Sequence, residues 1–254
     1  MKNIIDLQFP ETYPQNVLYA IEKYIDCFPY EIKEDINKYK IIHDVDIGCA
    51  VEKYLRPYKA ETLYRELNEK FLNYYFVVYH ATRLMDDSIK KDGFYMDKKE
   101  YLNYLKDIYV SEGFGDEELI TVIDIISDEY TRKYENSSYR LNFFGNKLDF
   151  IGNNKNGYDQ FCENIGGELA RWALQESNSN FYEPLKKGKP CVIKFKIKFS
   201  DIANYKKDEI IYEFIKFICA KKFFGRDYKI SFEANTEKKI SGKNILEIIK
   251  IEEQ

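Results

Sequence analysis

Residues 74–83 of the chain read Tyr74-Tyr75-Phe76-Val77-Val78-Tyr79-His80-Ala81-Thr82-Arg83, and the interpretation of the fold begins from this stretch. Its first six residues are aromatic or β-branched, and such residues are enriched in strands because they pack well on a pleated surface. The run is too short for an amphipathic helix, so it predicts a buried strand that ends at His80. Polar residues directly follow the apolar run, so the end of this strand is the first place to look for chemistry.

Helical periodicity dominates on both sides of the predicted strand. Apolar residues spaced by three and four predict a helical N-terminal segment from Tyr13 to about Leu72. Residues 85–92 predict a short helix closed by Gly93, since glycine readily takes the left-handed conformation that often ends a helix. The charged, periodic residues 97–136 predict an inserted group of helices with a break near residues 111–115.

Four further strands and two further helices are predicted after the insertion. Strands are expected at residues 139–144, 191–199, 228–233 and 245–251, of which 191–199 alternates most clearly between apolar and lysine residues. Helices are expected from residue 158 to 174, with a break at Gly166-Gly167, and at residues 210–222, while residues 184–190 predict a loop. The pattern indicates an α+β fold with a helical extension at residues 1–73 and a second domain at residues 74–254.

Composition and charge narrow the class of protein. The 254 residues include 44% hydrophobic and 32% charged residues, which is typical of a globular chain, and the net charge of −4 excludes the broad basic face of a non-specific nucleic-acid binder. The five cysteines form no CxxC pair of the kind that binds zinc, so we expect reduced thiols and no metal site. No signal-peptide or membrane-spanning pattern occurs, which predicts a cytoplasmic protein without a membrane partner.

His80 is the better of two histidines as a candidate for a functional site, because His43 lies in a polar stretch. Ala81 is small enough for a ligand to approach the backbone, Thr82 adds a hydroxyl, and Arg83 carries a fork of donors suited to phosphate. A histidine at a strand end is more often structural than catalytic, so its neighbours decide the interpretation.

The run from Phe76 to Arg83, followed by Ile89 and Gly93-Phe94, resembles the first motif of the ADP-ribosyltransferase superfamily. In that motif a strand ends in Tyr-His-small-Thr/Ser before a helix and a glycine. The resemblance covers about twenty residues and is closest to the branch with a His-Tyr-Glu triad, which includes diphtheria toxin and the poly-ADP-ribose polymerases. It implies a split, mostly antiparallel β core with a cleft that binds NAD as a substrate.

The resemblance also implies roles for individual residues. His80 would bind the adenosine ribose, the backbone of Ala81 would hold the nicotinamide amide, and Thr82 would help to place the nicotinamide. Arg83 and Arg140 complete the set of cationic residues expected to bind the dinucleotide. The ring that stacks on the cationic nicotinamide is expected to be Tyr139 or Tyr158, with Tyr95, Phe143 and Phe144 as further candidates.

Two glutamates compete for the role of the catalytic carboxylate that stabilises the oxocarbenium-like transition state. Glu168 follows Gly166-Gly167 at the expected start of a helix and lies near Arg171 and the only tryptophan. Glu233 lies at the expected end of a late strand, which matches the family order better. We rank Glu168 slightly ahead, although each could be an ordinary capping or strand-end acid.

The resemblance implies transfer of ADP-ribose from NAD to a protein or nucleic-acid acceptor, with release of nicotinamide, in a bacterial toxin or phage-defence effector. The N-terminal helices could bind a regulatory partner. A tRNA 2′-phosphotransferase-like enzyme ranks lower, because few basic residues accompany Arg83 and Arg140. The alternatives from other classes are a module that binds NAD or an ADP-ribose-type nucleotide without catalysis, and a structural interaction protein.

Overall fold

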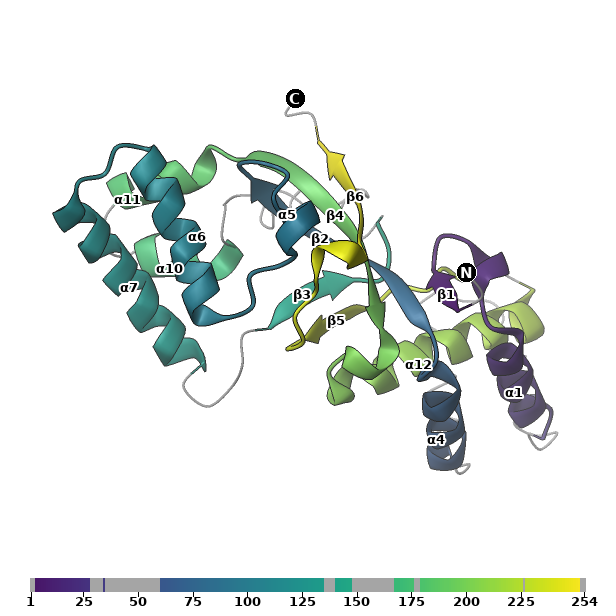
Figure 1. Cartoon of the computed structure of the whole chain (residues 1–254). Helices are drawn as coiled ribbons and strands as arrows, with labels where there is room; N and C mark the ends of the chain where they lie inside the picture. The colour runs from purple at the N-terminus through teal and green to yellow at the C-terminus, as the bar shows by residue number, and fades with distance from the viewer. Residues whose placement is uncertain are drawn as a thin grey trace. The chain divides into compact units, whose positions relative to one another are not determined.

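The computed structural model describes residues 3–27, 34, 60–134, 140–147, 167–175, 179–225 and 227–251 (Figure 1). The helices are α1 (Gln15–Asp26), α4 (Ala60–Phe71), α5 (Ile89–Asp92), α6 (Lys98–Ser111), α7 (Asp116–Tyr134), α10 (Gly167–Gln175), α11 (Ser179–Lys186) and α12 (Asn204–Cys219). Short 3-10 helices occur at Pro10–Thr12 (η1), Phe199–Asp201 (η2) and Gly242–Asn244 (η4), and a π-helix (η3) follows α12 at Ala220–Phe224.

Six strands form the sheet: β1 (Ile4–Asp6), β2 (Tyr75–Leu84), β3 (Leu141–Phe144), β4 (Lys189–Lys198), β5 (Glu233–Thr236) and β6 (Ile245–Lys250). Their order is β5-β3-β2-β4-β6, and β1 adds a parallel pairing to the start of β2. The pairs β2–β3 and β4–β6 are antiparallel. The expectation of a mostly antiparallel α+β fold is therefore confirmed, while the ADP-ribosyltransferase-like split core stays a prediction.

The chain divides into two compact units, each made of two segments. Unit 1 comprises residues 1–77 and 198–234, and unit 2 comprises residues 78–197 and 235–254. The expected domain boundary between residues 73 and 74 would give two continuous domains, whereas each compact unit is made of two separate segments. The domain boundary stays a prediction. Among the described residues, no helix combines the length and apolar character needed to cross a membrane.

The core of unit 1 is built from aromatic rings on different elements. The ring of Phe71 from α4 lies 5.6 Å from Phe76 of β2, 5.2 Å from Phe199 and 5.1 Å from Phe214 of α12, centroid to centroid. Such tilted and edge contacts add to the free energy of burying the rings. The abundance of phenylalanine and tyrosine in the sequence is thus partly explained by this core.

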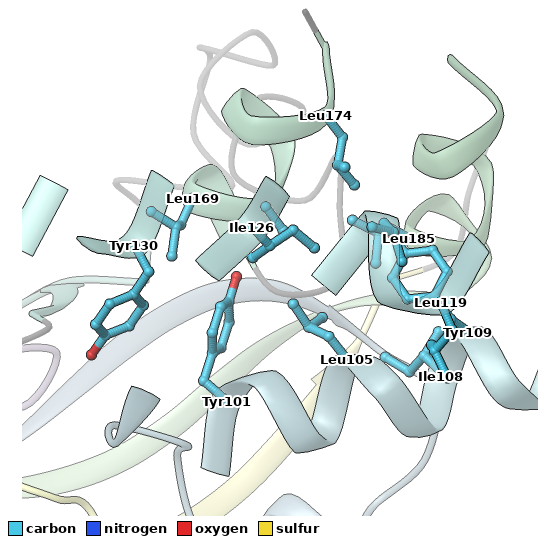
Figure 2. Close-up of a cluster of buried hydrophobic side chains, with 12 residues drawn as sticks. Tyr101, Leu105, Ile108, Tyr109, Leu119, Ile126, Tyr130, Leu169, Leu174 and Leu185 are labelled. Atoms are coloured by element: carbon cyan, nitrogen blue, oxygen red, sulfur yellow. The ribbon is translucent and has the colours of Figure 1, made fainter. Parts of the chain in front are cut away.

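In unit 2 the helices of the predicted insertion, α6 and α7, share a hydrophobic core with α10 and α11, called the insertion core here (Figure 2). Leu105 of α6 and Ile126 of α7 are fully buried there, together with Leu174 of α10 and Leu185 of α11. The helices expected within residues 97–136 and the break between them are confirmed, because α6 ends at Ser111 and α7 begins at Asp116. Their interpretation as an insertion stays a prediction.

Several boundaries differ from the expectations, and the first two corrections concern β1 and β2. The N-terminal segment is not wholly helical, because Ile4–Asp6 pairs with Tyr75–Val77 as a strand. β2 does not end at His80 but continues to Leu84, since it has neighbouring strands on both sides. His80 therefore lies within a strand.

Three further corrections concern two elements of the C-terminal half and the short helix before Gly93. Residues 184–190 are not all loop, because α11 runs through Pro184 to Lys186 and buries Leu185 in the insertion core. The strand expected at residues 228–233 is wrong, since β5 begins only at Glu233. The helix expected at residues 85–92 is shorter and begins at Ile89.

Candidate functional site

His80 lies on β2 with its half-buried ring held by two neighbours in unit 2. Its Nδ1 atom is 2.7 Å from the carbonyl oxygen of Asn142 on β3. The ring of Phe94, which follows α5, meets the imidazole edge-on at 5.3 Å between centroids. The side chain is therefore fixed in place from the adjacent strand and from the segment that returns after β2.

The partners of His80 determine its protonation state. A carbonyl oxygen can only accept a hydrogen bond, so Nδ1 must carry the proton and donate it to Asn142. Burial disfavours the imidazolium and lowers the pKa of His80 from 6.5 to about 4, although the bond to Asn142 acts in the opposite direction. At neutral pH the ring is therefore neutral, with a lone pair on Nε2 that can accept a hydrogen bond.

A close approach of two backbone segments places Phe94 against His80. Gly93 has a φ of 81°, and a Cβ there would collide with the carbonyl oxygen of Ile240. The amide of Phe94 donates to the same carbonyl at 3.0 Å, and its ring packs against Phe195 of β4 at 5.2 Å. The glycine that was expected to close the helix thus also allows the chain to return to the histidine.

The three residues after His80 are buried or make contacts within the protein. Ala81 and Thr82 are buried, and the carbonyl of Thr82 accepts a contact of 3.5 Å from the thiol of Cys191 on β4. The Nη1 atom of Arg83 donates to the carbonyls of Lys186 and Gly188 at 3.0 and 2.7 Å. One arm of the guanidinium therefore holds the turn before β4.

The remaining candidates divide into described and undescribed positions. Arg140 is exposed and forms an ion pair with Glu237 at 3.1 Å. Tyr139 and Tyr158 lie outside the described residues, as does the side chain of Glu168, whose backbone is the second residue of α10. The expected placement of Glu233 at the end of a strand is wrong, because it is the exposed first residue of β5.

The candidate stacking rings have partners within the protein. Phe143 is fully buried on β3 and packs edge-on against Phe195, which makes it a core residue, while Phe144 is half-buried. Tyr95 stacks on Tyr104 of α6, with centroids 4.7 Å apart and an interplanar angle of 25°. Burial raises the pKa of both phenols, so both remain protonated and able to donate a hydrogen bond.

Sequence reasoning missed the contributions of Asn142 and Tyr104. Asn142 acts through its backbone carbonyl, and no side-chain pattern indicates such a role. Tyr104 belongs to the helical insertion, where the spacing of apolar residues indicated only a helix. The aromatic character of residue 104 was the one available signal, and it was shared with many core tyrosines.

Comparison with known proteins provides no relative from which a function could be inferred: no family model matches the chain, and no curated protein or solved structure matches it.

Proposed function

We propose that the chain binds NAD beside His80 and transfers its ADP-ribose to a macromolecular acceptor, with release of nicotinamide. The observation that supports this proposal is the hydrogen bonding of the imidazole. Because Nδ1 is committed to the carbonyl of Asn142 and the ring is neutral, Nε2 can accept a hydrogen bond from a ribose hydroxyl. This is the role that the resemblance assigns to His80.

The chemical step needs a carboxylate near the ribose. Either Glu168 or Glu233 would stabilise the cationic ribosyl group while the glycosidic bond breaks and its electrons leave with nicotinamide. A nucleophile of the acceptor then bonds to the same ribose carbon and gives up its proton. Such an enzyme would fit a bacterial toxin or a phage-defence effector.

Labelled NAD incubated with the full chain and a cell extract tests this function. We expect release of nicotinamide and label in the protein or nucleic-acid fraction, and His80→Ala should abolish both because it removes the ribose contact. Lys106→Ala, an exposed change on α6, is the control and should retain activity. Circular dichroism should confirm that His80→Ala still folds, and full activity in that folded variant would contradict the proposal.

The two glutamates can be separated in the same assay. Glu168→Gln and Glu233→Gln each remove one negative charge with little change in size. We expect one of them to reduce nicotinamide release by about 100-fold or more, since charge stabilisation in the transition state is commonly worth about that much. Near-normal rates in both variants would show that neither is the catalytic carboxylate.

A second candidate is a module that binds NAD or an ADP-ribose-type nucleotide without cleaving it. It is favoured by the contacts of His80, which among the described residues are a backbone carbonyl and an aromatic ring rather than a carboxylate. A binder would be stabilised by NAD, by about 2.7 kcal/mol at a hundred times the dissociation constant, and would leave the NAD intact. Consumption of NAD identifies the enzyme.

A further inference from the structure

β6, in unit 2, forms one edge of the sheet. Its inner side pairs with β4 in an antiparallel register that places Cys191 opposite Lys250 and Lys194 opposite Glu247. Among the described residues, no strand pairs with its outer side (Figure 1). The outer side of an edge strand presents a row of backbone N–H and C=O groups that can bind another strand. This edge is therefore a candidate interaction surface.

The pairing with β4 determines which residues of β6 direct their backbone groups outward. The amide of Ile251 donates to the carbonyl of Pro190 at 3.1 Å. In an antiparallel pair every second residue bonds to the partner strand, so the bonds to β4 recur at the odd-numbered residues from 251 back to 247. The even-numbered Ile248 and Lys250 therefore direct their N–H and C=O groups away from β4.

The side chains of β6 are mainly apolar, yet none of them is buried in the chain. The strand reads Ile-Leu-Glu-Ile-Ile-Lys, and each of its residues is half-buried or exposed. Leu246, which lies where the register with β4 shifts, is 46% exposed. Apolar, β-branched residues on an open edge favour pairing with a further strand.

A second copy of the chain offers the same outward groups in a matching arrangement. In a two-fold antiparallel pair, opposed residues must differ in number by an even amount, because side chains on one face of a strand recur at every second residue. Pairing Ile248 of each copy with Lys250 of the other meets this condition. Each outward N–H and C=O group of these residues then has a partner.

Hydrogen bonding and charge together favour this register over its neighbours. It is centred on Ile249, which lies opposite its own copy in the close, non-hydrogen-bonded type of pair. A centre at Glu247 would place two carboxylates directly opposite one another, which is destabilising. A centre at Ile248 would place Lys250 opposite Leu246, where the register shift disrupts regular hydrogen bonding.

We propose that two copies of the chain associate through β6, with the strands antiparallel and centred on Ile249, so that the sheets of the two copies become continuous. The backbone of Ile248 and Lys250 would supply the hydrogen bonds, and Ile249 would pack against its copy. The proposal concerns self-association and does not depend on NAD chemistry.

Sedimentation equilibrium of the full chain at micromolar concentrations tests the association. We expect a dimer in the original protein and at least about tenfold weaker association for Ile248→Pro, because proline removes an outward N–H from each copy and spares the bonds to β4. Ile249→Lys should also weaken the dimer, since it places two cations opposite one another. Lys243→Gln, an exposed change just before β6, is the control and should leave the association unchanged.

Cysteine cross-linking tests the register. Ile249→Cys should form a disulfide between copies on oxidation, because opposed residues of a non-hydrogen-bonded pair have Cα atoms about 4.5 Å apart, within reach of a disulfide. Glu247→Cys is the matched control on the same face, since its two copies would lie more than about 13 Å apart. The background carries three changes that leave only buried thiols: Cys27→Ser, Cys49→Ser and Cys162→Ser.

Each result decides the question. A monomer at every concentration would overturn the proposal. A dimer that both Ile248→Pro and Ile249→Lys leave unchanged would also overturn it, since another surface would then be responsible. A disulfide at residue 247 and not at residue 249 would contradict the register. Circular dichroism shows whether the proline and lysine variants keep the fold, and the cross-linking decides the proposal without them.

Discussion

At the scale of single residues, His80 is defined by a hydrogen bond that its own sequence neighbourhood does not contain. Its proton donor faces the carbonyl of Asn142, 62 positions later in the chain, and its ring packs against Phe94. The hydrogen bond to Asn142 fixes which nitrogen carries the proton, and burial keeps the imidazole neutral. The consequence is a measurable dependence of stability on pH.

The free energy of unfolding should fall as the pH is lowered from about 6.5 to about 4. The unfolded histidine takes up a proton near its ordinary pKa of 6.5, whereas the folded ring does so only near 4. The contribution of neutral His80 to the free energy of unfolding is thus fully present above pH 6.5 and is lost on acidification. It should be on the order of 1–2 kcal/mol, less than the full pKa difference implies, because solvent reaches the half-buried ring. Urea unfolding at pH 7.5 and pH 4.5 should show a smaller decline for His80→Gln than for the original chain.

Gly93 and Gly242 allow the backbone contact that brings Phe94 to His80. A Cβ on Gly242 would collide with the carbonyl oxygens of Lys90 and Lys91, just as one on Gly93 would collide with Ile240. Gly242→Ala should therefore lower the free energy of unfolding by about 2 kcal/mol or more. Gly115→Ala is the control, since the nearest atom to its Cβ would be 3.9 Å away, and similar losses for the two variants would refute the close approach.

At the scale of elements, α12 organises the segment that leads to β5. The carboxylate of Glu213, which is 8% exposed, accepts hydrogen bonds from the hydroxyl of Tyr228 at 2.9 Å and the amide of Ser231 at 3.3 Å. It also forms an ion pair with Lys216. These bonds hold residues 228–231 against the helix, which explains why no strand forms there.

Glu213→Gln should destabilise the chain by about 2–3 kcal/mol. The neutral amide cannot match the partly buried ammonium of Lys216 and two further donors, so charge and hydrogen-bond donors are left without compensation. Glu209→Gln on the same helix breaks only the exposed pair with Lys206 and should change stability by less than about 1 kcal/mol. Chemical denaturation of both variants measures the difference, and equal effects would refute the role of Glu213.

At the scale of the whole molecule, the two compact units are each assembled from segments distant in sequence. In unit 1, α12 buries Phe214 against Phe71 of α4 and against Tyr13 near the N-terminus. The residues before β2 therefore supply part of the core for residues 198–234. A division of the chain at residue 73 would separate these partners.

In a fragment that begins at residue 74, the backbone amides of α12 should consequently not be protected from hydrogen exchange. Without α1 and α4 the apolar face of α12, including Phe214, loses its covering residues and about 1.5–3 kcal/mol per large side chain. Hydrogen exchange should be fast at residues 204–219 of the fragment and slow in the full chain. Slow exchange in both would support the expectation of an independent domain at residues 74–254.

Local patterns were sufficient for those elements whose stability arises mainly from their own periodicity. The alternation in β4, the periodic helices α6 and α7, and the aromatic run that becomes β2 were all predictable, because side-chain spacing reflects which face is buried. For the candidate site, the sequence singled out His80 and its neighbours as a resemblance to a known motif. It did not determine which nitrogen of the ring is protonated.

Tertiary contacts decided the rest. β1 is a strand because it pairs with β2, β5 begins late because Glu213 binds the preceding segment, and α11 extends through Pro184 because Leu185 is buried in the insertion core. These outcomes depend on residues far apart in the chain, and local propensities of a few tenths of a kcal/mol per residue do not encode such partners. The same reason applies to His80: the amino-acid sequence supplied the imidazole, while burial in the folded chain keeps it neutral and the adjacent strand fixes which nitrogen can accept a hydrogen bond.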